Sequence, residues 1–347
     1  MAGGIGSRFW PMSQEDLPKQ FLDVLGTGKT LIQMTYERLS RVVPKEQIYV
    51  VTNKKYQKLV AEQIPLTEDQ ILLEPQRKNT APCIAYAAHK IYDLDKEANL
   101  IVAPSDHLIL KEDRFVRIIQ KALDKSDKDN TIVTLGIKPS RPDTGYGYIQ
   151  FEGEGDIVMG EVRKVKQFTE KPNRELAEIF VKSGDYYWNS GIFIWKAETI
   201  INALNKFKPE LNSLFTSKSK KYNTPKEQEF VDLAFKHCED ISIDFAVLEN
   251  AKNVHVVLAN FGWSDLGTWG SLYTHLDKDV NGNAVLGNEV HLFESEDCIV
   301  NIPNNKTVLL QGLIGYIVVE ANGILMVVKK EDEQKIKSYV KLINQED

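Results

Sequence analysis

Short runs of apolar, β-branched residues alternate with longer amphipathic segments through the first half of the chain. Three of these runs are apolar on both faces and predict buried strands: Ile48–Thr52, Asn99–Ala103 and Thr131–Gly136. Three intervening segments carry apolar residues at helical spacing and predict helices: Lys55–Gln63, Thr80–Tyr92 and Asp113–Lys125. Strands that alternate with helices are typical of βαβ units. This half therefore predicts an α/β fold with a mostly parallel mixed sheet flanked by helices.

The pattern changes after about residue 140. Tyr146–Phe151 and Val162–Thr169 predict antiparallel strands, and Arg174–Lys182 predicts a helix. A further strand is expected at Gly191–Trp195, followed by helices that continue through Phe235. Ahead of these, Thr80 is expected to cap its helix, because Ala81-Pro82 follows it and proline favours the first helical turn.

The last part of the chain is rich in strands and turns. Short strands with turn signals predominate from Asn281 to Val328, and a charged helix is expected over Glu331–Ile343. Asn281-Gly282-Asn283 is a turn signal and a plausible boundary. We therefore expect a large α/β domain over 1–280 and a small β-rich domain over 281–347. A short solenoid and a small sheet both fit, since no clean six-residue period is visible.

Composition excludes several classes of protein. The net charge is −6, which argues against a broad nucleic-acid surface. Cys83, Cys238 and Cys298 lie far apart and form no metal-binding spacing, which is typical of reduced cysteines in a reducing compartment. The sequence contains no apolar stretch of about eighteen residues and no signal peptide at Met1, so we expect a cytoplasmic protein without a membrane partner.

The first residues form a glycine-rich loop. Gly3, Gly4 and Gly6 allow backbone N–H groups to approach a phosphate without Cβ obstruction. Arg8 adds a cationic fork, and Lys19 can supply a second positive charge. A flexible, glycine-rich terminus is the simpler alternative, because glycine loops are a weak signal.

Two related motifs are absent. The loop is not a dinucleotide-binding fingerprint, because Phe9 stands where the third glycine belongs. Gly26–Thr30 resembles the end of a P-loop, but Asp23 occupies the first glycine position. A phosphate loop normally follows a strand, yet only Met1 and Ala2 precede Gly3. We therefore expect a strand of roughly eight to ten residues ahead of the loop.

Two aspartates are candidates for metal binding. Asp106 directly follows the predicted strand Asn99–Ala103, and ligands of open α/β sheets lie beyond the carboxyl ends of strands. Asp265 lies in Trp263-Ser264-Asp265-Leu266-Gly267. Mg²⁺ is often held by one or two carboxylates together with substrate phosphates and waters, so these two aspartates suffice. A turn aspartate is the alternative for Asp106, and His107 beside it reads better as a structural histidine than as a general base.

These motifs occur together and in an order that resembles the nucleotidyl-sugar pyrophosphorylases, most closely their guanylyl branch, the mannose-1-phosphate guanylyltransferases. The resemblance covers most of the first 270 residues and is carried by these segments: Gly3-Gly4-Ile5-Gly6-Ser7-Arg8-Phe9-Trp10-Pro11, Pro18-Lys19-Gln20-Phe21, Glu74-Pro75, Asn79-Thr80-Ala81-Pro82, Pro104-Ser105-Asp106-His107, Thr144-Gly145-Tyr146-Gly147-Tyr148-Ile149, Phe168-Thr169-Glu170-Lys171-Pro172, Trp188-Asn189-Ser190-Gly191 and Trp263–Gly267. The family implies a Rossmann-like nucleotide-diphospho-sugar transferase domain with a small β-helix-like domain after it.

The resemblance also implies a role for each matching residue. Nucleotide binding falls to Gly3, Gly4, Gly6, Arg8, Lys19, Glu74, Asn79, Thr80, Ser105 and Asp106, of which Glu74, Asn79 and Thr80 line the guanosine pocket. Sugar-phosphate binding falls to Gly145, Glu170, Lys171, Asn189 and Gly191, with Lys171 on the phosphate. Catalysis falls to Arg8, Lys19 and Asp106, and Mg²⁺ to Asp106 and Asp265. The chain departs from the family at Cys83, where a small residue such as alanine is more usual.

The reaction that the family implies transfers GMP from GTP to mannose 1-phosphate. A phosphate monoester is already mostly ionised at neutral pH, so the attacking group needs no general base. The same chemistry with dTTP or UTP and glucose 1-phosphate stays open, as does a catalytically silent, nucleotide-sensing paralogue. A dehydrogenase is excluded by the missing third glycine. A homodimer stays open, since composition does not fix the oligomeric state.

Overall fold

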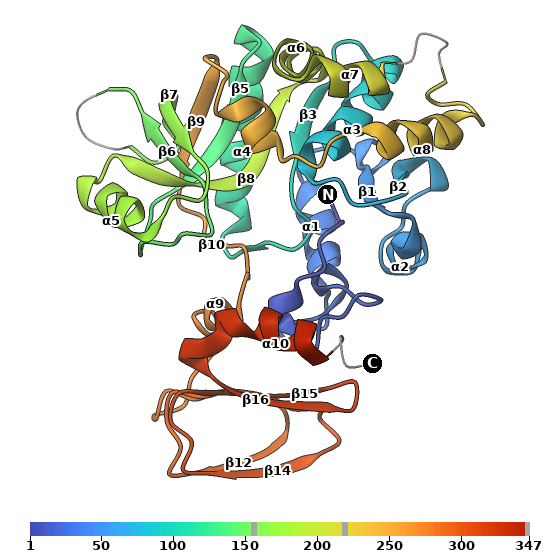
Figure 1. Cartoon of the computed structure of the whole chain (residues 1–347). Coiled ribbons are helices and arrows are strands. Elements are labelled where there is room, and N and C mark those ends of the chain that lie inside the picture. The colour runs from blue at the N-terminus through green and yellow to red at the C-terminus, as the bar shows by residue number, and fades with distance from the viewer. Residues whose placement is uncertain (154–157, 217–220, 344–347) are drawn as a thin grey trace.

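The computed structural model describes residues 1–153, 158–216 and 221–343 (Figure 1). Its α-helices are α1 Leu31–Leu39, α2 Gln57–Gln63, α3 Thr80–Leu94, α4 Glu112–Asp129, α5 Arg174–Ser183, α6 Ala197–Phe207, α7 Pro209–Phe215, α8 Glu227–His237, α9 Trp269–Tyr273 and α10 Ile336–Ile343. Its strands in the first part of the chain are β1 Val50–Asn53, β2 Ile71–Glu74, β3 Asn99–Val102, β4 Leu108–Ile109, β5 Ile132–Ile137, β6 Tyr148–Phe151, β7 Val162–Thr169, β8 Tyr186–Lys196, β9 Val254–Ala259 and β10 Trp263–Ser264. Its later strands are β11 Ala284–Leu286, β12 Glu289–Phe293, β13 Ile299–Asn301, β14 Thr307–Gln311, β15 Tyr316–Ala321 and β16 Ile324–Lys329. Two 3-10 turns, η1 Ser7–Phe9 and η2 Lys19–Phe21, follow the glycine loop, and a π-helical turn, η6 Asp244–Leu248, precedes β9.

The central sheet is mixed, with the strand order β3-β8-β5-β9-β7-β6. The long strand β8 lies between β3 and β5 and is antiparallel to both, and β7 is antiparallel to β9 and β6. Among the described ladders of this part only β1–β2 and β5–β9 are parallel. The predicted α/β class is confirmed, but the prediction of a mostly parallel sheet was wrong. The direction of a strand relative to its neighbours, such as that of β8 between β3 and β5, leaves no trace in the local periodicity of the sequence.

Most predicted elements occur close to their predicted bounds, and β7 matches them at both ends. The cap of α3 is a correction. Asn79 is the N-cap residue, and its Oδ1 accepts a hydrogen bond from the backbone N–H of Thr80. The Thr80 hydroxyl instead accepts a hydrogen bond from the N–H of Ile243, at 2.8 Å. The start of α3 is therefore tied to the segment that leads into η6.

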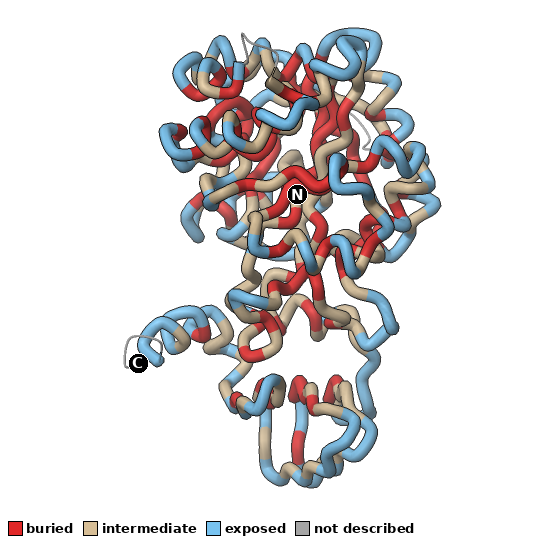
Figure 2. The backbone as a smooth tube through the Cα atoms, turned by 90° about the vertical axis from the view of Figure 1, so that its right-hand side faces the viewer, coloured by how far each residue is buried: buried red, intermediate tan, exposed pale blue. Residues whose placement is uncertain are grey.

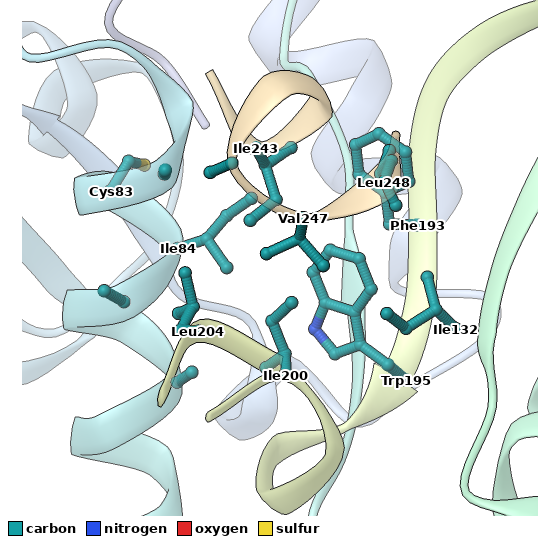
Figure 3. Close-up of a cluster of buried hydrophobic side chains, with 14 of the residues drawn as sticks. Cys83, Ile84, Ile132, Phe193, Trp195, Ile200, Leu204, Ile243, Val247 and Leu248 are labelled. Carbon is teal, nitrogen blue, oxygen red and sulfur yellow. The ribbon is translucent and has the colours of Figure 1, made fainter. Parts of the chain in front are cut away.

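The largest apolar core lies on one face of the central sheet, between it and the helices α3 and α6. Figure 3 shows this cluster: Ile243, which precedes η6, and Val247 and Leu248 of η6 lie among Ile84 of α3, Ile200 and Leu204 of α6, and Phe193 and Trp195 of β8. Every one of these side chains is buried. Because apolar side chains hold it on several sides, η6 has a fixed position beside the end of β8.

The first two residues lie between β1 and β3. The Met1 ammonium donates to the carbonyl of Ala103 at 2.8 Å, and the N–H of Ala2 donates to the carbonyl of Val51 at 2.7 Å. Beside them an apolar cavity of about 390 Å³ separates β1 from β3. Its walls include Ile32, Val51, Ile84 and Leu100. The strand expected ahead of Gly3 stays a prediction.

The last part of the chain forms two stacked coils. β11, β13 and β15 stack in parallel, and β12 stacks on β14 (Figure 1). Ala284 pairs with Ile299 and Ile299 with Ile317, so successive coils are 15 and 18 residues long. This difference in coil length explains why no six-residue period is visible. The parallel stacking of the coils favours the solenoid over a small flat sheet. The predicted final helix consists of a 3-10 turn over Lys330–Lys335 followed by α10.

Buried residues are concentrated in the α/β part, and the coils are exposed along much of their outer surface (Figure 2). The turn Asn281-Gly282-Asn283 lies between α9 and β11, where the boundary is predicted, and the division into domains stays a prediction. None of the helices in the described part of the chain has the length and hydrophobicity needed to cross a membrane.

Candidate functional site

The glycine loop presents free backbone donors. The Gln20 amide donates to the carbonyls of Ala2 and Gly4, at 2.9 and 3.1 Å, and the Ser13 hydroxyl donates to the carbonyl of Ile5. The loop's carbonyl groups are thus held by protein donors. No described residue accepts a hydrogen bond from the N–H groups of Gly3, Gly4 or Gly6. A run of unpaired N–H groups is the arrangement that binds a phosphate.

The two ends of this loop differ in their freedom. Gly6 has a φ of 70°, and a Cβ there would lie 2.6 Å from Cβ of Lys19, so the position requires glycine. A Cβ on Gly4 would meet nothing within 4 Å. Arg8 is exposed, and its guanidinium makes no hydrogen bond or ion pair with any described residue. The predicted loop is therefore open on one side, with an unpaired cation beside it.

Lys19 joins the two predicted metal-binding aspartates. Its buried ammonium lies 2.9 Å from Oδ2 of Asp106, 2.7 Å from the carbonyl oxygen of Asp265 and 3.0 Å from that of Leu266. All three ammonium N–H groups are therefore engaged, and two segments 159 residues apart in the sequence, Asp106 and Asp265, meet at Lys19. The sequence predicted these three residues at one site, and the structure brings them together.

Tyr146 orients the Asp265 side chain. Its hydroxyl donates to Oδ1 of Asp265 at 2.7 Å, and the N–H of Gly267 donates to the same oxygen at 3.1 Å. Leu266 between them has a φ of 45°, which is costly for a branched side chain. The turn is held in this conformation by its bonds to Lys19 and Tyr146. Tyr146 occurs in one of the matched motifs, but the sequence assigned it no role.

His107 is held as a neutral ring beside Asp106. The indole N–H of Trp263 donates to its Nδ1 at 3.2 Å, and its Nε2 lies 4.0 Å from Oδ1 of Asp106. Burial lowers the pKa of His107 below its usual range. Burial opposes ionisation of Asp106, but the charge of Lys19 and the hydrogen bond from its ammonium act against burial, and the pKa of Asp106 lies below its ordinary value. This arrangement favours the structural reading of His107 over a general base.

Glu74 supplies an unpaired buried acceptor at the far side of the loop. Its side chain is 5% exposed, and its Oε1 has no hydrogen-bond partner among the described residues. Oε2 lies 3.5 Å from the position that a Cβ on Gly3 would take, so the carboxyl borders the loop. Burial raises the pKa of Glu74 to about 7, against the opposing effect of the Cys83 thiol in the first turn of α3. A buried carboxyl oxygen without a partner, such as Oε1, is typical of a position that a ligand satisfies.

The other residues predicted for the nucleotide side differ in position. Asn79 is exposed at the start of α3 and has the strained φ of 65°. Thr80 follows it, with its hydroxyl engaged by Ile243. Ser105 is buried, lines the cavity between β1 and β3, and has no partner for its hydroxyl among the described residues. Ser105 is thus behind the loop rather than in the Lys19 cluster.

Glu170 and Lys171 lie on the sugar side of the predicted site, at the end of β7. The Glu170 carboxylate is 6% exposed and accepts from the Lys171 ammonium at 2.5 Å, while the Lys171 side chain is 57% exposed. A Cβ on Gly147 would lie 2.6 Å from Oε2 of Glu170, so the Glu170 carboxylate can occupy this position only because residue 147 is glycine. Gly145 is exposed nearby, but Asp143 accepts its N–H at 2.9 Å.

Asn189 is held by three hydrogen bonds in β8. Its Oδ1 accepts from the Thr134 hydroxyl at 2.8 Å and from the N–H of Gly191 at 3.3 Å. Its Nδ2 donates to Oδ1 of Asp244 at 3.0 Å. Gly191 also borders the metal-side cluster, because a Cβ there would lie 3.9 Å from the His107 ring. The sugar-side residues and the Lys19 cluster therefore form one continuous region.

Sequence reasoning missed Tyr146, Thr134 and Asp244. Tyr146 stands between two glycines of a matched motif, which is a usable signal. Thr134 lies inside a buried strand and Asp244 in a π-helical turn, and neither has a motif or period that would mark it. π-helical turns are frequent at functional sites, but they are not visible in a sequence.

Comparison with known proteins gives consistent matches. A family model described as nucleotidyl transferase matches residues 1–282. The chain is 36% identical to a putative mannose-1-phosphate guanylyltransferase of Vibrio cholerae, over 100% of this chain and 74% of that protein. It is 36% identical to the alginate biosynthesis protein AlgA of Pseudomonas aeruginosa, over 98% of this chain and 70% of that protein. A solved structure titled mannose-1-phosphate geranyltransferase, from Thermus thermophilus, has a TM-score of 0.86 at 28% identity, with 99% of this chain and 98% of that chain covered.

Proposed function

Since the chain belongs to the nucleotidyl transferase family, we propose that it transfers GMP from GTP to mannose 1-phosphate, forming GDP-mannose and pyrophosphate. The names of its relatives support this choice of substrates, because one protein named mannose-1-phosphate guanylyltransferase and one named putative mannose-1-phosphate guanylyltransferase match it at 36% identity over 99% or more of the chain. Relatives that align over the whole chain carry more weight than fold likeness alone.

One observation carries the proposal: a loop of unpaired N–H groups lies beside an unpaired arginine, and the segment that follows it joins two aspartates through Lys19. The N–H groups of Gly3, Gly4 and Gly6 suit the phosphates of a nucleotide. Arg8 is free to bind their charge bidentately. No other described part of the chain combines such a loop with a free cation and a lysine that contacts two aspartates, one through its carboxylate and one through its backbone carbonyl.

Mg²⁺ fits the donors at this site. Asp106 and Asp265 offer hard carboxylate oxygens, which Mg²⁺ prefers, and phosphate oxygens of the substrate complete its coordination. No group of three or more His, Cys, Asp or Glu residues within the described ranges lies close enough to hold a metal alone, in keeping with a metal that arrives with a nucleotide. We propose that Asp106 and Asp265 hold Mg²⁺, which would supply positive charge to the phosphate groups.

The chain's own residues then have to bring two anions together. GTP carries roughly four negative charges and the sugar phosphate about two, and these repel in a cleft with little water. The loop N–H groups and Arg8 would hold the nucleotide phosphates, and Lys171 would hold the sugar phosphate. Lys19 would act mainly by holding Asp106 and the Asp265 turn at fixed positions relative to each other. A phosphate oxygen of the sugar attacks the α-phosphorus in line, the bond to the leaving pyrophosphate breaks, and no proton has to be removed.

The preference for guanine is supported by Glu74. Guanine presents an N1–H and an exocyclic amino group as adjacent donors, and a carboxylate can accept both. The unpaired Oε1 of Glu74 is buried beside the loop, where the base of a bound nucleotide would be near. Adenine offers no such pair of adjacent donors.

The test is pyrophosphate release in the presence of Mg²⁺, with GTP, ATP, UTP and dTTP each combined with mannose 1-phosphate and glucose 1-phosphate. Release that is strong only with GTP and mannose 1-phosphate is the expected result. Strong release with another pair would overturn the substrates and keep the chemistry. A folded chain that binds GTP and releases no pyrophosphate with any pair would favour a silent, nucleotide-sensing protein.

A further inference from the structure

We infer that Asp244 determines specificity for the sugar, acting as the positioning residue that fixes the Asn189 amide in the hexose site. This inference rests on the proposed function for the location of that site. The observation behind it is the hydrogen bond of 3.0 Å that the Asn189 amide nitrogen donates to Oδ1 of Asp244. Without a partner of this kind, an asparagine amide can rotate by half a turn and exchange its donor for its acceptor.

The other contacts of Asn189 are compatible with the orientation that Asp244 requires. The backbone N–H of Gly191 points at the amide oxygen, and an amide nitrogen in that place would set donor against donor. The Thr134 hydroxyl of the neighbouring strand β5 lies 2.8 Å from the same amide oxygen and can donate to it. Asp244 then accepts from the nitrogen. Asn189 therefore presents the same N–H direction to any ligand that lies beside it on β8.

Asp244 is itself held firmly. It is the first residue of η6, and the side chains of Val247 and Leu248 in this turn, and of Ile243 just before it, are buried among α3, α6 and β8 (Figure 3). The N–H of Ile243 donates to the Thr80 hydroxyl, so the segment before Asp244 is fixed to the start of α3. Asp244 thus lies between the nucleotide side and the sugar side of the proposed site.

Asp244 also has an electrostatic partner on the sugar side. Burial and the nearby charge of Glu170 raise its pKa to about 7, with Lys171 opposing the shift. Glu170 borders Gly147, whose carbonyl accepts the N–H of Asn189 at 2.8 Å. Glu170 and Asn189 therefore meet at Gly147, and the Asp244 carboxyl binds the Asn189 amide beside them. Hydroxyl groups of a hexose are bound by such groups, and a fixed amide rejects an isomer whose hydroxyl points elsewhere.

The experiment compares Asp244→Ala, Asp244→Asn and the control Asp240→Asn, each in the full chain. Asp240 is exposed in the same segment and makes no hydrogen bond with the described residues, so its substitution removes a similar charge without touching Asn189. In Asp244→Ala the KM for mannose 1-phosphate should rise about tenfold while the KM for GTP changes by less than about twofold. The ratio of kcat/KM for mannose 1-phosphate over glucose 1-phosphate should fall. Asp244→Asn should restore the KM to within about threefold of the wild type, because its amide oxygen can accept the same hydrogen bond.

The outcomes separate this inference from the proposed function. Normal wild-type turnover with unchanged KM values in Asp244→Ala would overturn the inference alone, as would equal rises in both KM values or an equal effect of Asp240→Asn. If the wild type shows no turnover, its binding of mannose 1-phosphate and glucose 1-phosphate is measured by calorimetric titration. Binding that Asp244→Ala weakens about tenfold would then support the inference although the proposed function fails. A folded wild type that binds neither sugar phosphate would overturn both.

Discussion

The Lys19 ammonium is the point at which Asp106 and the Asp265 turn meet, and Lys19→Met isolates its contribution. Methionine keeps the length of the buried chain and removes the charge. The substitution leaves the Asp106 carboxylate and the carbonyls of Asp265 and Leu266 without their donor. A loss of roughly 3–5 kcal/mol is typical when one partner of a buried ion pair is removed. The Asp106 side chain is 29% exposed and water offsets part of this loss, so about 3 kcal/mol of the free energy of unfolding is expected.

A double-mutant cycle tests the reasoning. Asp106→Asn keeps an oxygen that can accept from Lys19, and it should cost about 1–2 kcal/mol. The double variant has neither charge, so no buried charge is left without a partner. Its loss in free energy of unfolding should therefore be smaller than the sum of the two single losses by about 1–3 kcal/mol. Urea unfolding without Mg²⁺ or nucleotide measures these values, and equal slopes of the transitions show that the unfolded states are comparable. Lys29→Met is the control, because Lys29 pairs with Glu37 at 2.7 Å on the surface and should cost less than about 1 kcal/mol.

Turnover gives an independent readout of the same variants. We expect Lys19→Met and Asp106→Asn each to lower turnover by about 10²–10³, and we expect the double variant to stay inactive although part of its stability returns. Losses of stability that simply add, or a Lys19→Met loss no larger than that of Lys29→Met, would refute the proposed coupling. Near-normal turnover of either single variant would remove that residue from the mechanism.

Other variants probe the loop, the metal site and the base pocket. Gly4→Ala should leave stability within about 0.5 kcal/mol, because a Cβ there meets no atom within 4 Å, yet raise the KM for GTP about tenfold by placing a methyl group on the open side of the loop. Gly6→Ala should lower the free energy of unfolding by about 1–3 kcal/mol, since φ is 70° and the new Cβ would lie 2.6 Å from Lys19 Cβ; equal urea midpoints for the two variants would contradict this. Asp265→Asn can keep its bonds to Tyr146 and Gly267, so the thermal midpoint should change little while the Mg²⁺ concentration for half-maximal turnover rises at least about tenfold. The pKa of Glu74 is raised from 4.5 to about 7, so its carboxyl binds a proton more tightly in the folded state than in the unfolded state. The free energy of unfolding is therefore higher at low pH and should fall by roughly 3 kcal/mol as the pH rises from 4.5 to 7. Glu74→Gln should abolish this slope in urea midpoints measured across that range, and an unchanged slope would contradict the assignment.

The order of the elements could be predicted from the sequence because helices and strands impose a local period. The strand over Val162–Thr169 and the helix from Thr80 were predicted to within a few residues for that reason. The antiparallel insertion of β8 between β3 and β5 could not, because pairing between residues 51 to 97 positions apart leaves no local pattern. Site residues divide in the same way. Asp106 and Asp265 were found from motifs, whereas the contact of Thr134 with Asn189 depends on which strands are neighbours.

The coils at the end of the chain pack against two segments of the candidate site. Phe9, directly after Arg8, is fully buried with its ring 4.9 Å from that of Trp269, four residues after Asp265. Both rings belong to one apolar cluster with Ile299 and Ile317 of the coils, and the Asn322 amide donates to the carbonyl of Pro11 at 3.2 Å. The loop with its unpaired N–H groups and the turn with Asp265 are therefore anchored in the same cluster. Free donors have to be held in place if they are to bind a phosphate without being reordered, and the packing of the coils against Phe9 and Trp269 provides that rigidity.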